Sequence, residues 1–194
     1  LDFHRKYYHP SNSYIYLYGD LDMYKELDYI DKEYLSSFDH REIDSTIAVQ
    51  TAYEQMKDES CFYSIAENES EENQTFLTYN MLVGSSLDKK QSVAMNILEY
   101  AIMDAPGAPL KKALVDAGIG EDVFASFDDG IRQTIFSIVA RNANMSDKER
   151  FVSVIRDTLT DLSGHGEEGK AIDRTSIEAA INNFEFKHKE ANFG

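Results

Sequence analysis

Short stretches in which apolar and polar residues alternate predict β-strands, because side chains along a strand point to opposite faces in turn. The first is residues 14–18, in which tyrosines at every second position share one face and Ile15 and Leu17 share the other. We expect two later strands to form a hairpin, because an Asp-Asp-Gly turn joins them. The further predicted strands are residues 46–55, 61–66, 75–83, 123–127 and 134–142.

Apolar residues three or four positions apart predict amphipathic helices elsewhere in the chain. The predicted helices are residues 22–38, 87–104 and 110–117, one after Ser146 and one after Asp173. Ser146 and Glu149 fit a capping box, in which each side chain bonds to the backbone N–H of the other residue. We expect Asp20 or Asp22 to cap the first helix and Asp173 to cap the last.

The order of these elements indicates the fold class. It runs strand, helix, several strands, two helices, a pair of strands and two helices, with neither an internal repeat nor a long linker. A chain of 194 residues, of which 42% are hydrophobic, is long enough to bury a substantial core. We therefore predict one α+β domain spanning residues 1–194, with a mostly antiparallel sheet and helices covering one face.

The charge of the chain narrows its possible partners. It carries 35 acidic against 19 basic residues, a formal net charge of −16. Such a chain repels phosphate backbones and anionic lipid, so we expect no nucleic-acid or membrane partner. The acidity either serves solubility or attracts basic peptides. No apolar run reaches the roughly 18 residues that a membrane-spanning helix needs.

The single cysteine, Cys61, excludes a disulfide within the chain and indicates a reducing compartment, so we predict a cytoplasmic location. Its apolar, strand-like surroundings predict a thiol buried in the core. No signal peptide is visible at the start, which also lacks Met. We therefore expect the chain to be a piece of a longer protein.

The sequence offers no convincing catalytic or metal site. None of its histidines forms the His-x-x-Glu-His pair that closes on zinc from one helix face. His4 and His9 could meet a metal together with Asp2, but a solvated terminus is the simpler interpretation. The acidic residues 67–72 are predicted to form an exposed loop, because nothing near them would desolvate a carboxylate. We predict no catalytic residue, no metal ligand and no cofactor in this chain.

Four segments resemble the insulinase/pitrilysin superfamily of zinc metallopeptidases, in its presequence-protease branch. They appear in the family's order over nearly the whole chain. The first is similar to the start of that family's second domain, the next two to a helix-turn-helix signature and the strand pair after it, and the fourth to a late helix. The segments are FHRKYYHPSNSYIYLYGDLD at residues 3–22, APGAPLKKALVDAGIG at 105–120, FASFDDG at 124–130 and INNFEFK at 181–187.

The resemblance implies that this chain is the second, non-catalytic domain of the N-terminal half of a much larger protein. Its fold would be that of mitochondrial-processing-peptidase-like and LuxS-like metallohydrolases. The parent protein would be an ATP-independent zinc metalloendopeptidase that degrades short unfolded peptides in a closed chamber. The zinc ligands and the glutamate base would lie upstream of Leu1, and this domain would wall the chamber and support the catalytic domain.

The resemblance also implies partners, and the alternation along the predicted strands supplies candidate contact residues. The partners would be other domains of the same polypeptide and peptide substrates, basic ones among them. If helices cover one face of the sheet, the opposite face would present to the chamber Tyr14, Tyr16, Tyr18, Thr78 and Asn80. The alternative is that the tyrosines pack against a neighbouring domain. Two alternatives stay open: a zinc-less family member that acts as a scaffold or partner subunit, and a free-standing peptide-binding module.

Overall fold

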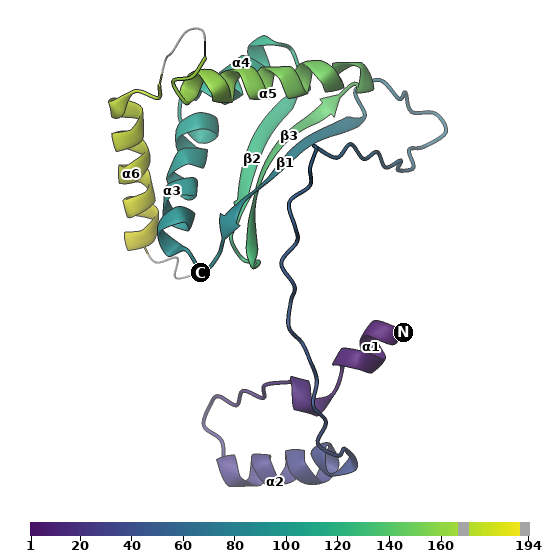
Figure 1. Ribbon diagram of the computed structural model, residues 1–194. Coiled ribbons are helices and arrows are strands. Elements are labelled where there is room, and N and C mark those ends of the chain that lie inside the picture. Colours follow the sequence, from purple (N-terminus) through teal and green to yellow (C-terminus); the bar gives the residue numbers. More distant parts are fainter. Residues whose placement is uncertain (167–170, 191–194) are drawn as a thin grey trace. The chain divides into compact units, whose positions relative to one another are not determined.

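The computed structural model describes residues 1–166 and 171–190, and these group into two compact units (Figure 1). The first unit is residues 1–49 and the second is residues 50–194. We describe each unit by itself. The single domain expected over residues 1–194 stays a prediction.

The first unit contains short helices. They are α1 (Asp2–Tyr7), the 3₁₀ turn η1 (Pro10–Asn12), α2 (Met23–Glu33) and the 3₁₀ turn η2 (Leu35–Ser37). The predicted helix at residues 22–38 is thus confirmed, and Asp22 caps it by accepting from the backbone N–H of Lys25 at 3.4 Å. The strand predicted at residues 14–18 is wrong. A strand needs a partner for its backbone groups, and the described residues of this unit provide none.

The second unit is built on a three-stranded antiparallel sheet in the order β1-β3-β2. The strands are β1 (Thr75–Ser85), β2 (Asp122–Asp128) and β3 (Gln133–Ala143), which confirms three of the predicted strands to within two residues. The strands predicted at residues 46–55 and 61–66 are wrong. In the first of these segments, Gln50 of the second unit is held by a side chain instead of by a neighbouring strand. The Gln133 carboxamide accepts from the Gln50 N–H at 2.7 Å and donates to its carbonyl at 3.0 Å.

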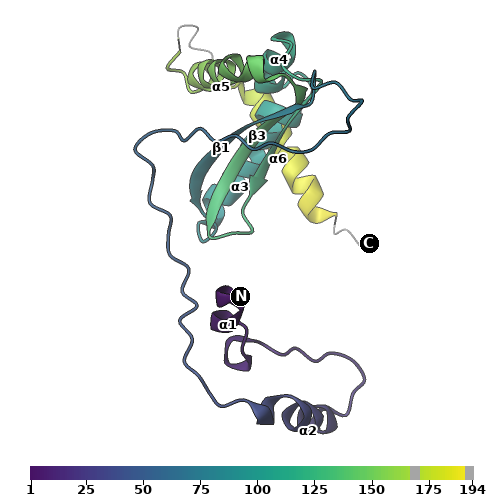
Figure 2. The ribbon, with the colours of Figure 1, turned by 90° about the vertical axis from the view of Figure 1, so that its right-hand side faces the viewer.

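Helices cover one face of this sheet (Figure 2). They are α3 (Lys89–Glu99), continued by the π-helical turn η3 (Tyr100–Asp104), then α4 (Pro109–Asp116) and α5 (Lys148–Leu162), which follows the 3₁₀ turn η4 (Met145–Asp147). The last helix, α6 (Arg174–Lys189), packs on α3 and begins at Asp173, whose carboxylate accepts from the N–H of Ser176 at 2.9 Å. The predicted α+β class, with helices on one face of an antiparallel sheet, is confirmed.

The core lies between the sheet and these helices. The strands contribute Leu77, Val123, Phe136, Ile138 and Ala140, all buried. From the helical side the buried residues are Ile102, Met103, Leu110, Leu114, Ile119, Phe151 and Ile155. Burial of these apolar side chains is the main term that stabilises the second unit.

The capping box before α5 begins two residues earlier than predicted. Asn144 and Asp147 form it, and the Asn144 N–H donates to the Asp147 carboxylate at 3.1 Å. The Asn144 amide also bonds to Asn73, accepting from its backbone N–H at 2.9 Å and donating to its side-chain oxygen at 2.8 Å. Ser146 lies inside η4 and is exposed, so the box predicted at Ser146 is wrong.

Replacing Asn144 should therefore destabilise the protein, whereas replacing Ser146 should not. Asn144→Ala removes the cap acceptor and the bonds to Asn73, so we expect a loss of about 1–2 kcal/mol of unfolding free energy. Ser146→Ala is the matched control, with an expected change below about 0.5 kcal/mol. Urea unfolding monitored by circular dichroism measures both. A larger loss of unfolding free energy for Ser146→Ala than for Asn144→Ala would contradict this assignment and indicate that Ser146 is the N-cap.

Candidate functional site

The candidate site is the face of the sheet that the helices leave uncovered. Along β1 the side chains alternate, so that Leu77 is buried toward the helices while Thr78 and Asn80 are exposed on the opposite face. The Asn80 amide donates to the Thr78 hydroxyl at 3.2 Å, so the two predicted residues lie side by side. The structure thus places this pair together on one surface.

The two other strands extend this surface. In the ladder, Thr78 lies opposite Val139, which lies opposite Phe124, and the next row joins Asn80 with Ser137 and Ser126. We call this surface the open face. Its members are Phe76, Thr78, Asn80, Leu82, Phe124, Ser126, Ile135, Ser137 and Val139, with the charged Asp122, Asp128 and Arg141 at its two ends. Within the described residues of the second unit, no helix packs on it.

Two features distinguish the open face from the rest of this acidic molecule. Its central rows carry hydroxyl, amide and apolar groups but no charge, although the chain has a net charge of −16. It also exposes aromatic rings, since Phe76 is 51% and Phe124 39% exposed. Such a surface can contact another polypeptide through apolar area and hydrogen bonds. The prediction missed both phenylalanines, although the period-two pattern around Thr78 could have revealed Phe76.

The three candidate tyrosines lie in the first unit, outside any strand. Tyr14, Tyr16 and Tyr18 are exposed, and the rings of Tyr16 and Tyr18 stack with centroids 6.4 Å apart. They therefore do not form the tyrosine-lined strand face that the sequence suggested. A chamber-facing role for Tyr14, Tyr16, Tyr18, Thr78 and Asn80 stays a prediction.

The described residues present little catalytic chemistry. In residues 1–166 and 171–190, no group of three or more His, Cys, Asp or Glu side chains could hold a metal ion. The acidic loop at residues 67–72 is exposed, as predicted. Cys61 is exposed as well, which corrects the prediction of a buried thiol: its segment does not join the sheet. None of the helices in the described part of the chain combines the length and apolar character needed to cross a membrane.

Comparison with known proteins places the chain in a family. The family described as "Peptidase M16 inactive domain" matches residues 1–184. A relative named "Protein HypA", from Clostridium perfringens, is 44% identical over 194 residues, covering 100% of this chain and 19% of the relative. The mitochondrial presequence protease of Xenopus tropicalis is 28% identical over 197 residues, covering 99% of this chain and 19% of that protein.

A plant relative and a solved structure agree with this assignment. Presequence protease 1 (chloroplastic/mitochondrial) of Arabidopsis thaliana is 30% identical over 197 residues, covering 100% of this chain and 18% of that protein. The solved structure is the inactive peptidase domain of a candidate zinc protease from Bordetella parapertussis. It matches with a TM-score of 0.50 and 16% identity over 59% of this chain and 60% of that chain, which supports the fold alone.

The chain spans about a fifth of the length of these curated relatives. The family match over residues 1–184 confirms, at the level of the family, the resemblance seen in residues 3–22 and 105–120. The chain belongs to the peptidase M16 inactive-domain family, within the insulinase-type superfamily.

Proposed function

We propose that this chain is a non-catalytic wall domain of a larger zinc metalloendopeptidase, which degrades short unfolded peptides in a closed chamber without ATP. Membership of an inactive-domain family supports the non-catalytic role. Relatives named presequence proteases support a peptidase as the parent protein. Because the relatives are about five times longer than the matched region, the other partners are domains of the same polypeptide.

The open face is the observation that carries this proposal. An extended peptide offers backbone donors and acceptors whatever its sequence, and Thr78, Asn80, Ser126 and Ser137 can bond to such groups. Apolar neighbours add contact area that does not depend on sequence. The wall therefore accepts many peptides, while the net charge of −16 attracts basic peptides at longer range.

Zinc belongs to the parent protein in this proposal and not to this chain. The sequence has no His-x-x-Glu-His motif, and the described residues bring no three suitable donors together. They do not fit a zinc site, so we derive no catalytic step through this domain. Its contribution is to enclose the substrate and to support the domain that holds the zinc.

A cytoplasmic location remains part of the proposal and depends only on the single, exposed Cys61, which needs no partner in a reducing compartment. The relatives from Xenopus and Arabidopsis are named as mitochondrial or chloroplastic/mitochondrial proteins. Fractionation of cells followed by immunoblotting distinguishes the cytosol from an organelle.

A charge placed on the open face tests the wall function in the full-length protein. Asn80→Arg should raise the KM for a basic peptide several-fold, because like charges repel in a confined chamber, and should leave zinc content unchanged. The matched control is Asn182→Arg, an exposed Asn on α6 outside the sheet, which should leave the KM unchanged. Equal KM values for wild type and Asn80→Arg would contradict the proposal that this face lines the chamber.

A further inference from the structure

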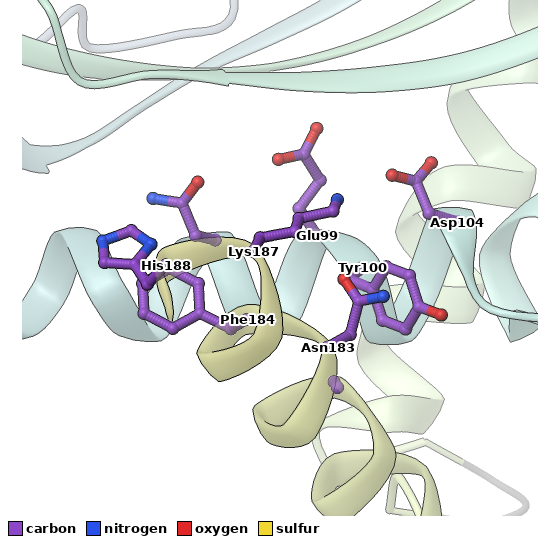
Figure 3. Close-up of a pocket in the computed structure, with 9 residues that line it drawn as sticks. Glu99, Tyr100, Asp104, Asn183, Phe184, Lys187 and His188 are labelled. Atoms are coloured by element: carbon purple, nitrogen blue, oxygen red, sulfur yellow. The ribbon is translucent and has the colours of Figure 1, made fainter. Parts of the chain in front are cut away.

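A second feature, separate from the open face, is a pocket between α3, its continuation η3, and α6 (Figure 3). Its volume is about 300 Å³, at the lower end for ligand pockets, which suits a single amino-acid side chain better than a large cofactor. The charged and aromatic side chains that line it are Glu99, Tyr100, Asp104, Phe184, Lys187 and His188.

A π-helical turn places two carboxylates of this pocket on the same side of the helix. In an α-helix, residues five apart such as Glu99 and Asp104 point about 140° away from each other. Here the Ala105 N–H donates to the Tyr100 carbonyl at 2.8 Å, an i→i+5 bond that widens the helix. Residues five apart therefore return toward one side, and Figure 3 shows both carboxylates there. Such turns are rare and concentrate at functional sites.

The electrostatics of the pocket favour an additional cation. Burial raises the pKa of the half-buried Glu99, and the negative charge of Asp104 raises it further, while Lys187 and the N–H of Phe127 oppose the shift. Lys187 reaches in from α6 with its ammonium 5.7 Å from the centre of the Tyr100 ring. Among the described residues, neither Glu99 nor Asp104 forms a salt bridge. Lys187 is thus a cation near Glu99 that forms no salt bridge with it.

We propose that this pocket binds the guanidinium group of an arginine, with Glu99 and Asp104 as its acceptors. A guanidinium is planar, so it can donate to two carboxylates while one face stacks on an aromatic ring. Tyr100 supplies such a ring at the pocket, whereas the Phe184 ring stacks on His188 with centroids 4.4 Å apart. Lys187 is the internal competitor, because its ammonium already lowers the pKa of Glu99 through its positive charge and lies over the Tyr100 ring on which the guanidinium would stack.

Titration of the chain, residues 1–194, followed by NMR tests this proposal at pH 7.5. Capped arginine (N-acetyl-arginine N-methylamide) should give saturable shifts at Glu99 and Asp104 with a millimolar Kd. Glu99→Gln and Asp104→Asn should each weaken binding at least fivefold. Lys187→Met should tighten it several-fold, because the competitor is gone. The matched control is Glu185→Gln, which removes an exposed carboxylate on α6, the helix that carries Lys187, and should leave the Kd unchanged.

The pKa of Glu99 gives a second readout that a merely structural role would not move. Binding should lower the pKa of Glu99, because a bound cation favours the ionised carboxylate. The titrations of Asp104, Lys187 and His188, the other titratable groups at the pocket, are followed in the same experiment. Free arginine serves as a second ligand: preference for the capped form indicates a polypeptide-borne arginine, and preference for the free form a small molecule. Equal shifts with capped citrulline, or equally tight binding of capped lysine, would overturn the assignment.

Discussion

Phe136→Ala should lower the free energy of unfolding by about 3–5 kcal/mol. Phe136 lies on the central strand β3, is 2% exposed, and belongs to the core that joins the sheet to Leu114 and Phe151. Its removal takes away apolar burial and leaves a cavity that the neighbouring side chains cannot fill, because the interior is close-packed. Urea unfolding should show a lower midpoint at an unchanged slope.

Phe124→Ala is the matched control for this prediction. Phe124 lies on β2 and on the open face, 39% exposed, so we expect a loss of about 1 kcal/mol or less from the isolated domain. If Phe136→Ala does not fold, Phe136→Leu keeps most of the volume and should cost about 1.5 kcal/mol. Equal losses for Phe136 and Phe124 would mean that the core does not lie on the helix side of the sheet.

Gly120→Ala should cost about 3 kcal/mol, the second large effect. Gly120 has a φ of +66°, and a Cβ atom added there would lie 2.7 Å from the carbonyl oxygen of Arg141. The substitution combines the strain of the left-handed conformation, about 1–2 kcal/mol, with a clash against backbone that cannot rotate away.

Gly118→Ala separates these two contributions. Gly118 has nearly the same φ, +65°, but a Cβ atom there would meet nothing within 4 Å. We therefore expect only the conformational cost of about 1–2 kcal/mol. The difference between the two midpoints in urea measures the clash. Equal losses would show that the loop before β2 shifts freely to accept the methyl group.

The sequence predicts the second unit well from residue 75 onward, and physical reasons explain why. In β1 and β3 the alternation is enforced by a helix-covered face, so pattern and structure agree. Residues 46–55 and 61–66 carry a similar pattern, but a pattern records only which faces could be buried. Because neither segment joins a sheet, apolar residues such as Val49 and Phe62 remain exposed.

Candidate site residues, too, could be placed from the sequence only where the predicted strand forms. Thr78 and Asn80 could be placed on the uncovered face because they are polar residues at every second position of a real strand. The alternating tyrosines suggested a strand face that did not form. No periodicity indicates a π-helical turn, so the approach of Glu99 to Asp104 was not predictable from their spacing of five. The helix start at Asn144 was missed because a 3₁₀ turn precedes α5.

Peptide hydrolysis by residues 1–194, measured beside the full-length protein with zinc supplied to both, tests the central claim most directly. A domain without zinc ligands should hydrolyse no peptide, whereas the full-length protein should cleave short unfolded peptides and lose this activity with a chelator. A full-length protein that stays inactive with zinc would contradict the proposed parent enzyme. Zinc-dependent turnover by residues 1–194 that survives repurification and disappears on His4→Ala or His9→Ala would contradict the non-catalytic role itself.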